Sequence, residues 1–118
     1  MADEQWAAVP GAPGYEVSSW GRVRRGPYEV ATWPNHKGYV MVSLEVADRE
    51  RPILRYVHRL VVAAFRGLDT RRRLVNHRDG NKGHNDLENL AWSTTASNVL
   101  HGRRLRLERL GQQSLFAV

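Results

Sequence analysis

Asparagine and histidine side chains concentrate in the segment from Leu74 to Asn98, although apolar residues bracket it. The segment holds five asparagines, two histidines and three carboxylates around two glycine-containing turns. An imidazole has a pKa near neutrality and can take up a proton, while amide and carboxylate oxygens can bind a hard cation. These side chains therefore either satisfy one another's hydrogen bonds or hold a ligand between them.

The residues around this segment predict the elements that position its polar side chains. Leu74-Val75 and Leu90–Trp92 are predicted as strands on either side of a turn-rich loop, and a helix is predicted to begin near Thr95. His77 then lies at the end of the first strand, and Asn98 lies about one turn into the helix. A strand–strand–helix unit can bring these two ends together, so that the polar side chains converge on one site.

The upstream part is predicted to form a small antiparallel sheet followed by a helix. Alternating apolar residues predict a strand, and apolar residues at helical spacing predict a helix over His58–Phe65. The predicted strands are Tyr15–Ser19, Arg22–Arg25, Glu29–Trp33, Tyr39–Val46 and Ile53–Val57. The whole pattern is typical of an α+β protein.

Charge favours a nucleic acid as the partner. The chain has 18 Lys and Arg against 12 Asp and Glu, and its formal net charge is +6. Most of the bases are arginines, which suit bidentate contacts with phosphate. A bias towards arginine from a GC-rich coding sequence remains the alternative explanation.

Composition also excludes some classes of protein. No apolar run is long enough to span a bilayer, and the N-terminus does not resemble a secretion signal, so we expect a soluble, cytoplasmic protein without a membrane partner. The chain has no cysteine, which rules out disulfides and cysteine-type zinc sites.

Two stretches of the sequence resemble a known family. The residues VHRLVVAAF and LVNHRDGNKGHNDLENLAWSTTASN resemble the HNH endonucleases, specifically the phage-type group related to intron-encoded homing nickases. The upstream GYEVSSWGRVRR and NHKGYVMVSL resemble the DNA-binding module that often precedes that nuclease core. The resemblance implies an N-terminal DNA-binding β module over residues 1–57. It also implies a ββα-metal (HNH) core with a C-terminal helix over residues 58–118.

The resemblance implies a role for each residue of the motif. His77 matches the general base that activates water, and Asn89 matches the residue that holds its imidazole in place. Asn76 and Asn98 match the ligands of one divalent metal, with Mg²⁺ preferred and Mn²⁺ as the alternative. His58 matches a histidine for which we infer a structural role. Many members have aspartate where this chain has Asn76, so no carboxylate is assigned to the metal.

Structural roles remain open as alternatives for several of these side chains. Asn89 can order the loop as well as contact His77, and Asn98 can bond to the backbone at the start of a helix. His101 suits either the metal site or the surface. The loop residues assigned to hydrogen bonding within the loop are Asn81, His84 and Asn85, and the carboxylates that can act on the metal through a water are Asp79, Asp86 and Glu88.

Basic side chains near the motif and in the N-terminal module are candidates for phosphate contacts. The alternative for each is a solvated surface. The set is Arg22, Arg24, Arg25, Arg71, Arg72, Arg73, Arg78 and Lys82.

The sequence therefore predicts a metal-dependent HNH endonuclease that nicks or cuts DNA. One alternative is a DNA-binding protein on the same scaffold whose nuclease activity is weak or lost, and a second is an RNA-binding or structural zinc domain. A homodimer, or a phage or host protein as partner, stays open. We expect the protein to act in the cytoplasm of a bacterial host and to be encoded by a phage or mobile element.

Overall fold

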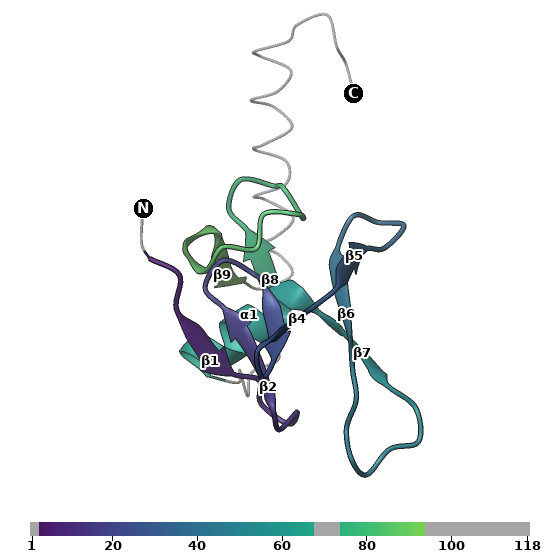
Figure 1. Cartoon of the computed structure of the whole chain (residues 1–118). Coiled ribbons are helices and arrows are strands. Elements are labelled where there is room, and N and C mark those ends of the chain that lie inside the picture. The colour runs from purple at the N-terminus through teal and green to yellow at the C-terminus, as the bar shows by residue number, and fades with distance from the viewer. Residues whose placement is uncertain (1–2, 68–73, 94–118) are drawn as a thin grey trace, which may run out of the picture.

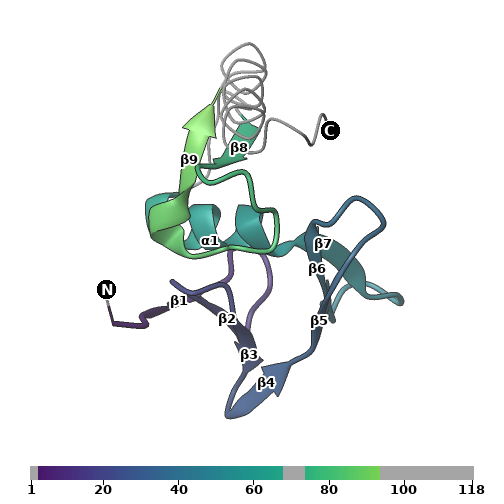
Figure 2. The same ribbon diagram turned by 90° about the horizontal axis from the view of Figure 1, so that it is seen from above.

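One helix lies at the centre of the computed structural model, between small β-sheets (Figures 1 and 2). The structure describes residues 3–67 and 74–93. Helix α1, Val57–Arg66, contacts strands of the N-terminal part and also the hairpin that follows it. Its bounds confirm the predicted helix to within one residue at each end. Several predicted features lie outside the described residues: Arg71, Arg72, Arg73, Asn98, His101 and the C-terminal helix.

The N-terminal part forms two antiparallel sheets. The first has the order β1-β2-β3-β4, with β1 at Trp6–Ala8, β2 at Tyr15–Ser18, β3 at Val23–Arg25 and β4 at Tyr28–Val30. The second has the order β5-β6-β7, with β5 at Thr32–Pro34, β6 at Val40–Leu44 and β7 at Ile53–Tyr56.

The predicted strand Glu29–Trp33 is divided between these two sheets. Its first half belongs to β4 and pairs with β3, while its second half belongs to β5 and pairs with β6. Only Ala31 separates the two strands. Residues that favour strands stand on both sides of Ala31, Tyr28 and Val30 before it and Thr32 and Trp33 after it, so local propensity does not indicate the change of pairing partner.

Buried aliphatic side chains join the sheets to the helix. Val42 and Leu44 of β6 are buried, as the alternation of residues 39–46 predicted. They belong to the same apolar cluster as Val57 and Val61 of α1. Because α1 also packs on the last hairpin, this shared core fixes the hairpin relative to the N-terminal sheets.

The chain from Leu74 to Ser93 forms the hairpin that carries the asparagine and histidine residues. Strand β8, Leu74–His77, pairs antiparallel with β9, Leu90–Ser93, and a short 3₁₀ helix η1 at Leu87–Asn89 leads into β9. The predicted strands therefore exist, with β8 extended by two residues so that it includes Asn76 and His77. The division into domains at residues 57 and 58 stays a prediction. None of the described helices is long and apolar enough to cross a membrane.

Candidate active site

His77 and Asn76 are the last two residues of β8. Successive side chains of a strand point to opposite faces. Val75 and His77 are buried, whereas Asn76 is half-buried, so the imidazole faces the core side of the hairpin. His77 pairs with Leu90 across the ladder, which anchors its backbone in regular structure. The strand end thus carries the imidazole and the amide at consecutive positions, with the imidazole on the core side and the amide on the opposite face.

The His77 imidazole is held by Asn85. The distance between His77 Nε2 and Asn85 Oδ1 is 2.8 Å, and the bond is buried. The sequence predicted a role for Asn89 here and assigned Asn85 to the loop. Asn85 comes from an irregular loop, where residue spacing carries no orientation, so only its type marked it as a candidate. The role predicted for Asn89 stays a prediction.

Asn89 organises the loop between the two strands. Its Nδ2 donates to Asp79 Oδ1 at 2.9 Å and to the His84 carbonyl at 2.8 Å, while its Oδ1 accepts from the Asp79 backbone N–H at 3.2 Å. His84 Nδ1 lies 2.6 Å from Asp79 Oδ2. Asn89 is buried, so these bonds fix the loop that carries Asn85.

The electrostatics of the loop match this hydrogen bonding. Burial alone would raise the pKa of Asp79, but bonds from His84, the Asn81 backbone and Asn89 together lower this pKa to about 2. The hydrogen bond to Asp79 in turn raises the pKa of His84. Asp79 is therefore ionised at neutral pH and adds a negative charge near His77.

Aromatic rings surround the candidate base. The ring centroids of His77 and His58 are 4.9 Å apart, and Tyr39 lies 5.4 Å from His58 and 6.2 Å from His77. Tyr56 contacts both Tyr39 and His58, at 5.7 Å and 5.5 Å. A cavity of about 190 Å³ opens next to His58 among these rings. His58 thus packs against His77, and the structural role inferred for it from the sequence stays a prediction.

Both buried imidazoles are neutral at pH 7. Burial lowers the pKa of His77, and this outweighs the hydrogen bond to Asn85 and the charge of Asp79, which raise it. Burial, helped by the neighbouring His77 and Arg59, lowers the pKa of His58 to about 3. Within the described residues, His58 Nδ1 has no hydrogen-bond partner. A neutral imidazole at His77 is the form that can accept a proton.

The low pKa of His58 predicts that acid destabilises the fold. Between the unfolded pKa of 6.5 and the folded pKa of about 3, the unfolded chain binds a proton that the folded protein does not bind. Between about pH 6.5 and about pH 3, His58 should therefore lower the free energy of unfolding by about 1.4 kcal/mol for each unit by which the pH falls. Urea unfolding at about pH 7.5 and about pH 5.5 measures the change.

A His58→Phe variant isolates this contribution. His77 acts with the same sign as His58 because its pKa is also lowered, whereas His84, with a raised pKa, acts with the opposite sign. In the variant, the free energy of unfolding should lose only the part of its pH dependence that comes from residue 58. Equal pH dependence in the wild type and His58→Phe would contradict the assignment.

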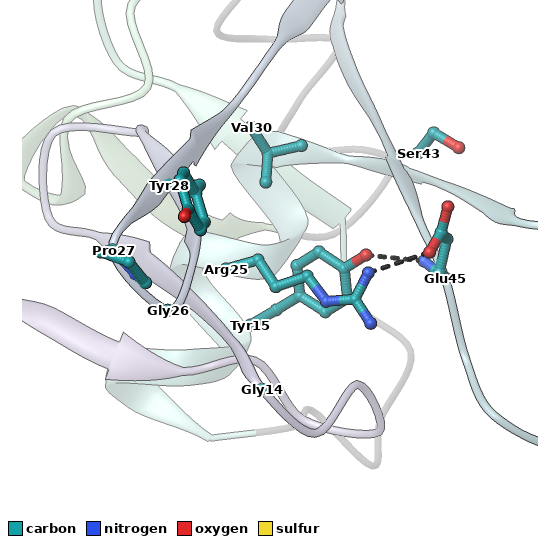
Figure 3. Close-up of a pocket in the computed structure, with 9 residues that line it drawn as sticks. All are labelled: Gly14, Tyr15, Arg25, Gly26, Pro27, Tyr28, Val30, Ser43 and Glu45. Carbon is teal, nitrogen blue, oxygen red and sulfur yellow. Dashed lines mark hydrogen bonds and ion pairs between the residues drawn. The ribbon is translucent and has the colours of Figure 1, made fainter.

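The three N-terminal arginines predicted to contact DNA are each paired with a carboxylate. In each pair, a guanidinium Nε or Nη1 atom lies 2.9 Å from a glutamate oxygen. Figure 3 shows the pair of Arg25, at the end of β3, with Glu45, the residue after β6. The pocket beside this pair has a volume of about 700 Å³. The pairs are Arg22 with Glu4, Arg24 with Glu16 and Arg25 with Glu45. Their contact with DNA stays a prediction, and a phosphate would have to compete with these carboxylates.

The other basic candidates lie on the hairpin loop. Arg78 is exposed directly after His77. Lys82 is also exposed; its Nζ donates to the Lys37 carbonyl at 3.0 Å and lies 4.7 Å from the centre of the Tyr39 ring. Lys82 therefore lies next to one of the rings around His77, and contact of either residue with DNA stays a prediction.

The potential metal ligands are amides. Within residues 3–67 and 74–93, no three histidine or acidic side chains converge in a way that could hold a metal. Asn76 is half-buried next to His77, and Asn98 lies outside the described residues. Amide oxygens suit a hard cation, so the donor chemistry at Asn76 fits Mg²⁺ or Mn²⁺.

The comparison with known families covers this site. Residues 55–100 match the family model described as HNH endonuclease. The chain contains an HNH endonuclease domain. This domain begins within β7 and includes α1, the hairpin and its loop. The predicted resemblance is thereby confirmed.

Two relatives of this chain come from a virus. It is 28% identical over 112 residues to the Uncharacterized HNH endonuclease L245 of Acanthamoeba polyphaga mimivirus, covering 94% of this chain and 33% of the relative. It is 34% identical over 103 residues to the Uncharacterized HNH endonuclease L247 of the same virus, covering 83% of this chain and 26% of the relative. The chain thus spans only about a third or a quarter of these relatives.

A solved structure shares the fold of this chain. It is described as DNA binding and cleavage by the HNH homing endonuclease I-HmuI, and it matches with a TM-score of 0.68 and 25% identity. The match covers 97% of this chain and 62% of that chain. The N-terminal sheets therefore belong to the shared fold together with the HNH domain, which confirms the predicted α+β class.

Proposed function

We propose that the protein is a metal-dependent DNA endonuclease that hydrolyses phosphodiester bonds, with His77 as the general base. The observation that carries the proposal is the imidazole itself. His77 is buried, neutral and hydrogen-bonded at the end of β8, one residue after Asn76 and inside the HNH domain. The comparison with I-HmuI supports DNA as the substrate.

His77 has the properties that a general base for hydrolysis requires. Its lowered pKa leaves the imidazole unprotonated at neutral pH, so it can take the proton of a water that attacks phosphorus. Its ring is fixed on both sides, by the bond to Asn85 and by packing against His58. A fixed base reduces the entropy cost of reaching the reactive geometry.

A divalent metal would be held by Asn76 and Asn98, and Mg²⁺ or Mn²⁺ suits oxygen ligands of this kind. Such a metal stabilises negative charge on the phosphate when it is bound. Because amides are neutral, the cation would keep its full charge, and its affinity in the absence of DNA would be low. Arg78 and Lys82 supply positive charge on the same loop.

The alternative function is DNA binding without cleavage, and the observation that favours it is the amide at position 76. Incubation of the purified protein with supercoiled plasmid and Mg²⁺ or Mn²⁺ distinguishes the two. We expect conversion to nicked or linear plasmid. A shift in plasmid mobility without cleavage, in either metal, would support the binding protein instead. The two relatives are proteins of a mimivirus. A role in a bacterial host and an origin in a phage or mobile element therefore stay predictions.

A further inference from the structure

The loop that carries Asn85, the hydrogen-bond partner of His77, packs against the N-terminal sheet. Asn85 is buried, and its Cβ and carbonyl lie against the turn between β2 and β3, residues 19–22. The Leu87 N–H donates to the Ser19 carbonyl at 2.7 Å, which adds a backbone bond on the same side. The backbone that carries Asn85 is thus held by a segment more than sixty residues earlier in the chain.

Gly21 lies directly against Asn85 in this contact. It has a φ of +88°, and a Cβ at this position would lie 2.8 Å from Asn85 Cβ and 3.2 Å from the Asn85 carbonyl oxygen. Carbon atoms in van der Waals contact are about 3.5–4.0 Å apart. A side chain at position 21 would therefore push the Asn85 backbone away from its present position.

Ser18 holds this turn in shape from inside the core. Ser18 is fully buried, and its Oγ accepts from the Trp20 N–H at 3.1 Å and from the Arg22 N–H at 3.0 Å. The Gly21 N–H donates to the Ser18 carbonyl at 3.0 Å. The turn is consequently a rigid surface for Asn85 to rest on.

We propose that the β2–β3 turn positions His77 through Asn85, which acts as a positioning residue and selects the tautomer of the imidazole. The inference rests on the proposed function, in which His77 is the base. The Asn85 oxygen can only accept a hydrogen bond, so the 2.8 Å contact requires the ring proton on Nε2. Nδ1 then carries the lone pair of the ring, and the N-terminal sheet contributes to the position of the imidazole.

The tautomer can be measured without any nuclease assay. In the full chain labelled with ¹⁵N-histidine, long-range ¹H–¹⁵N spectra distinguish a protonated ring nitrogen from an unprotonated one, and His77→Gln assigns the signals. We expect a protonated Nε2 at His77 in the wild type, kept in Asn85→Asp and lost or averaged in Asn85→Ala. A proton on Nδ1 in the wild type, or an unchanged tautomer in Asn85→Ala, would overturn the proposal.

Glycine variants test the link to the N-terminal sheet. Gly21→Ala is compared with Gly14→Ala, because Gly14 has a φ of +90° but a Cβ there meets nothing within 4 Å. Both glycines have a φ near +90°, so an alanine is strained at either position, whereas only the alanine at position 21 would meet Asn85. We expect Gly21→Ala to perturb the His77 ¹⁵N signals and to lower kcat by about 10- to 100-fold with KM for DNA little changed. Gly14→Ala should do neither.

The readouts separate this proposal from the proposed function. If neither metal supports cleavage but the tautomer depends on Asn85 and Gly21, the positioning stands and the nuclease assignment fails. If cleavage occurs but Gly21→Ala behaves like Gly14→Ala in both readouts, the nuclease stands and the positioning fails. Thermal unfolding of each variant identifies any that does not fold, and Asn85→Asp retains the acceptor if Asn85→Ala fails to fold.

Discussion

Replacement of His77 by alanine is expected to slow DNA cleavage by about 10²- to 10⁴-fold, the range that a positioned general base contributes. The loss should appear in kcat, because His77 is buried, whereas we expect the affinity for the DNA backbone to come from exposed basic side chains. Initial rates of plasmid nicking measure the effect, and gel-shift titration measures the affinity.

His36→Ala is the matched control for this substitution. His36 is exposed in the turn before β6, so its removal should leave the rate within about twofold. The wild-type rate should also remain level from about pH 7.5 to about pH 6.5 and fall in more acidic buffer, since the pKa of His77 is lowered from 6.5. Full activity of His77→Ala would remove His77 from the mechanism.

Removal of divalent metal with EDTA is expected to lower the cleavage rate by at least about 10³-fold. A metal at a phosphoryl oxygen contributes several kcal/mol of charge stabilisation, and about 1.4 kcal/mol corresponds to tenfold in rate. Addition of excess Mg²⁺ should restore the rate. Cleavage that continues unchanged in EDTA would contradict metal dependence.

Substitutions at Asn76 test whether this side chain is a ligand. Asn76→Asp adds a negative charge at the same geometry, so we expect a lower Mg²⁺ concentration for half-maximal rate. Asn76→Ala removes the oxygen and should raise that concentration by about tenfold or more. A half-maximal concentration that is the same in all three proteins would exclude residue 76 from the metal site.

The elements that carry the site were predictable from local pattern. Helix α1 followed from apolar residues at helical spacing, and strand β6 followed from alternation, because a buried face imposes a fixed period on its own residues. The hairpin strands β8 and β9 were found in the same way. The roles of Asn76 and His77 came from the resemblance to the HNH endonucleases, and they stay predictions.

The sequence did not predict the first strand or the division of the N-terminal sheet. Strand β1 is only three residues long and pairs with β2, so most of its stability comes from its partner and not from its own propensity. The change from β4 to β5 at Ala31 depends on which strand is available to pair. Neither the formation of β1 nor the change of pairing partner at Ala31 produces a periodic pattern of apolar residues in the sequence.

The sequence by itself therefore determined the chemical groups of this protein, the helix and strands that carry them and the family to which its HNH domain belongs. Only the tertiary structure decided which partners those groups have. Asn85 reaches His77, and Arg25 pairs with Glu45 in place of open solvent. Such contacts join residues from loops and separate sheets, and their distances depend on how the shared core packs these elements together.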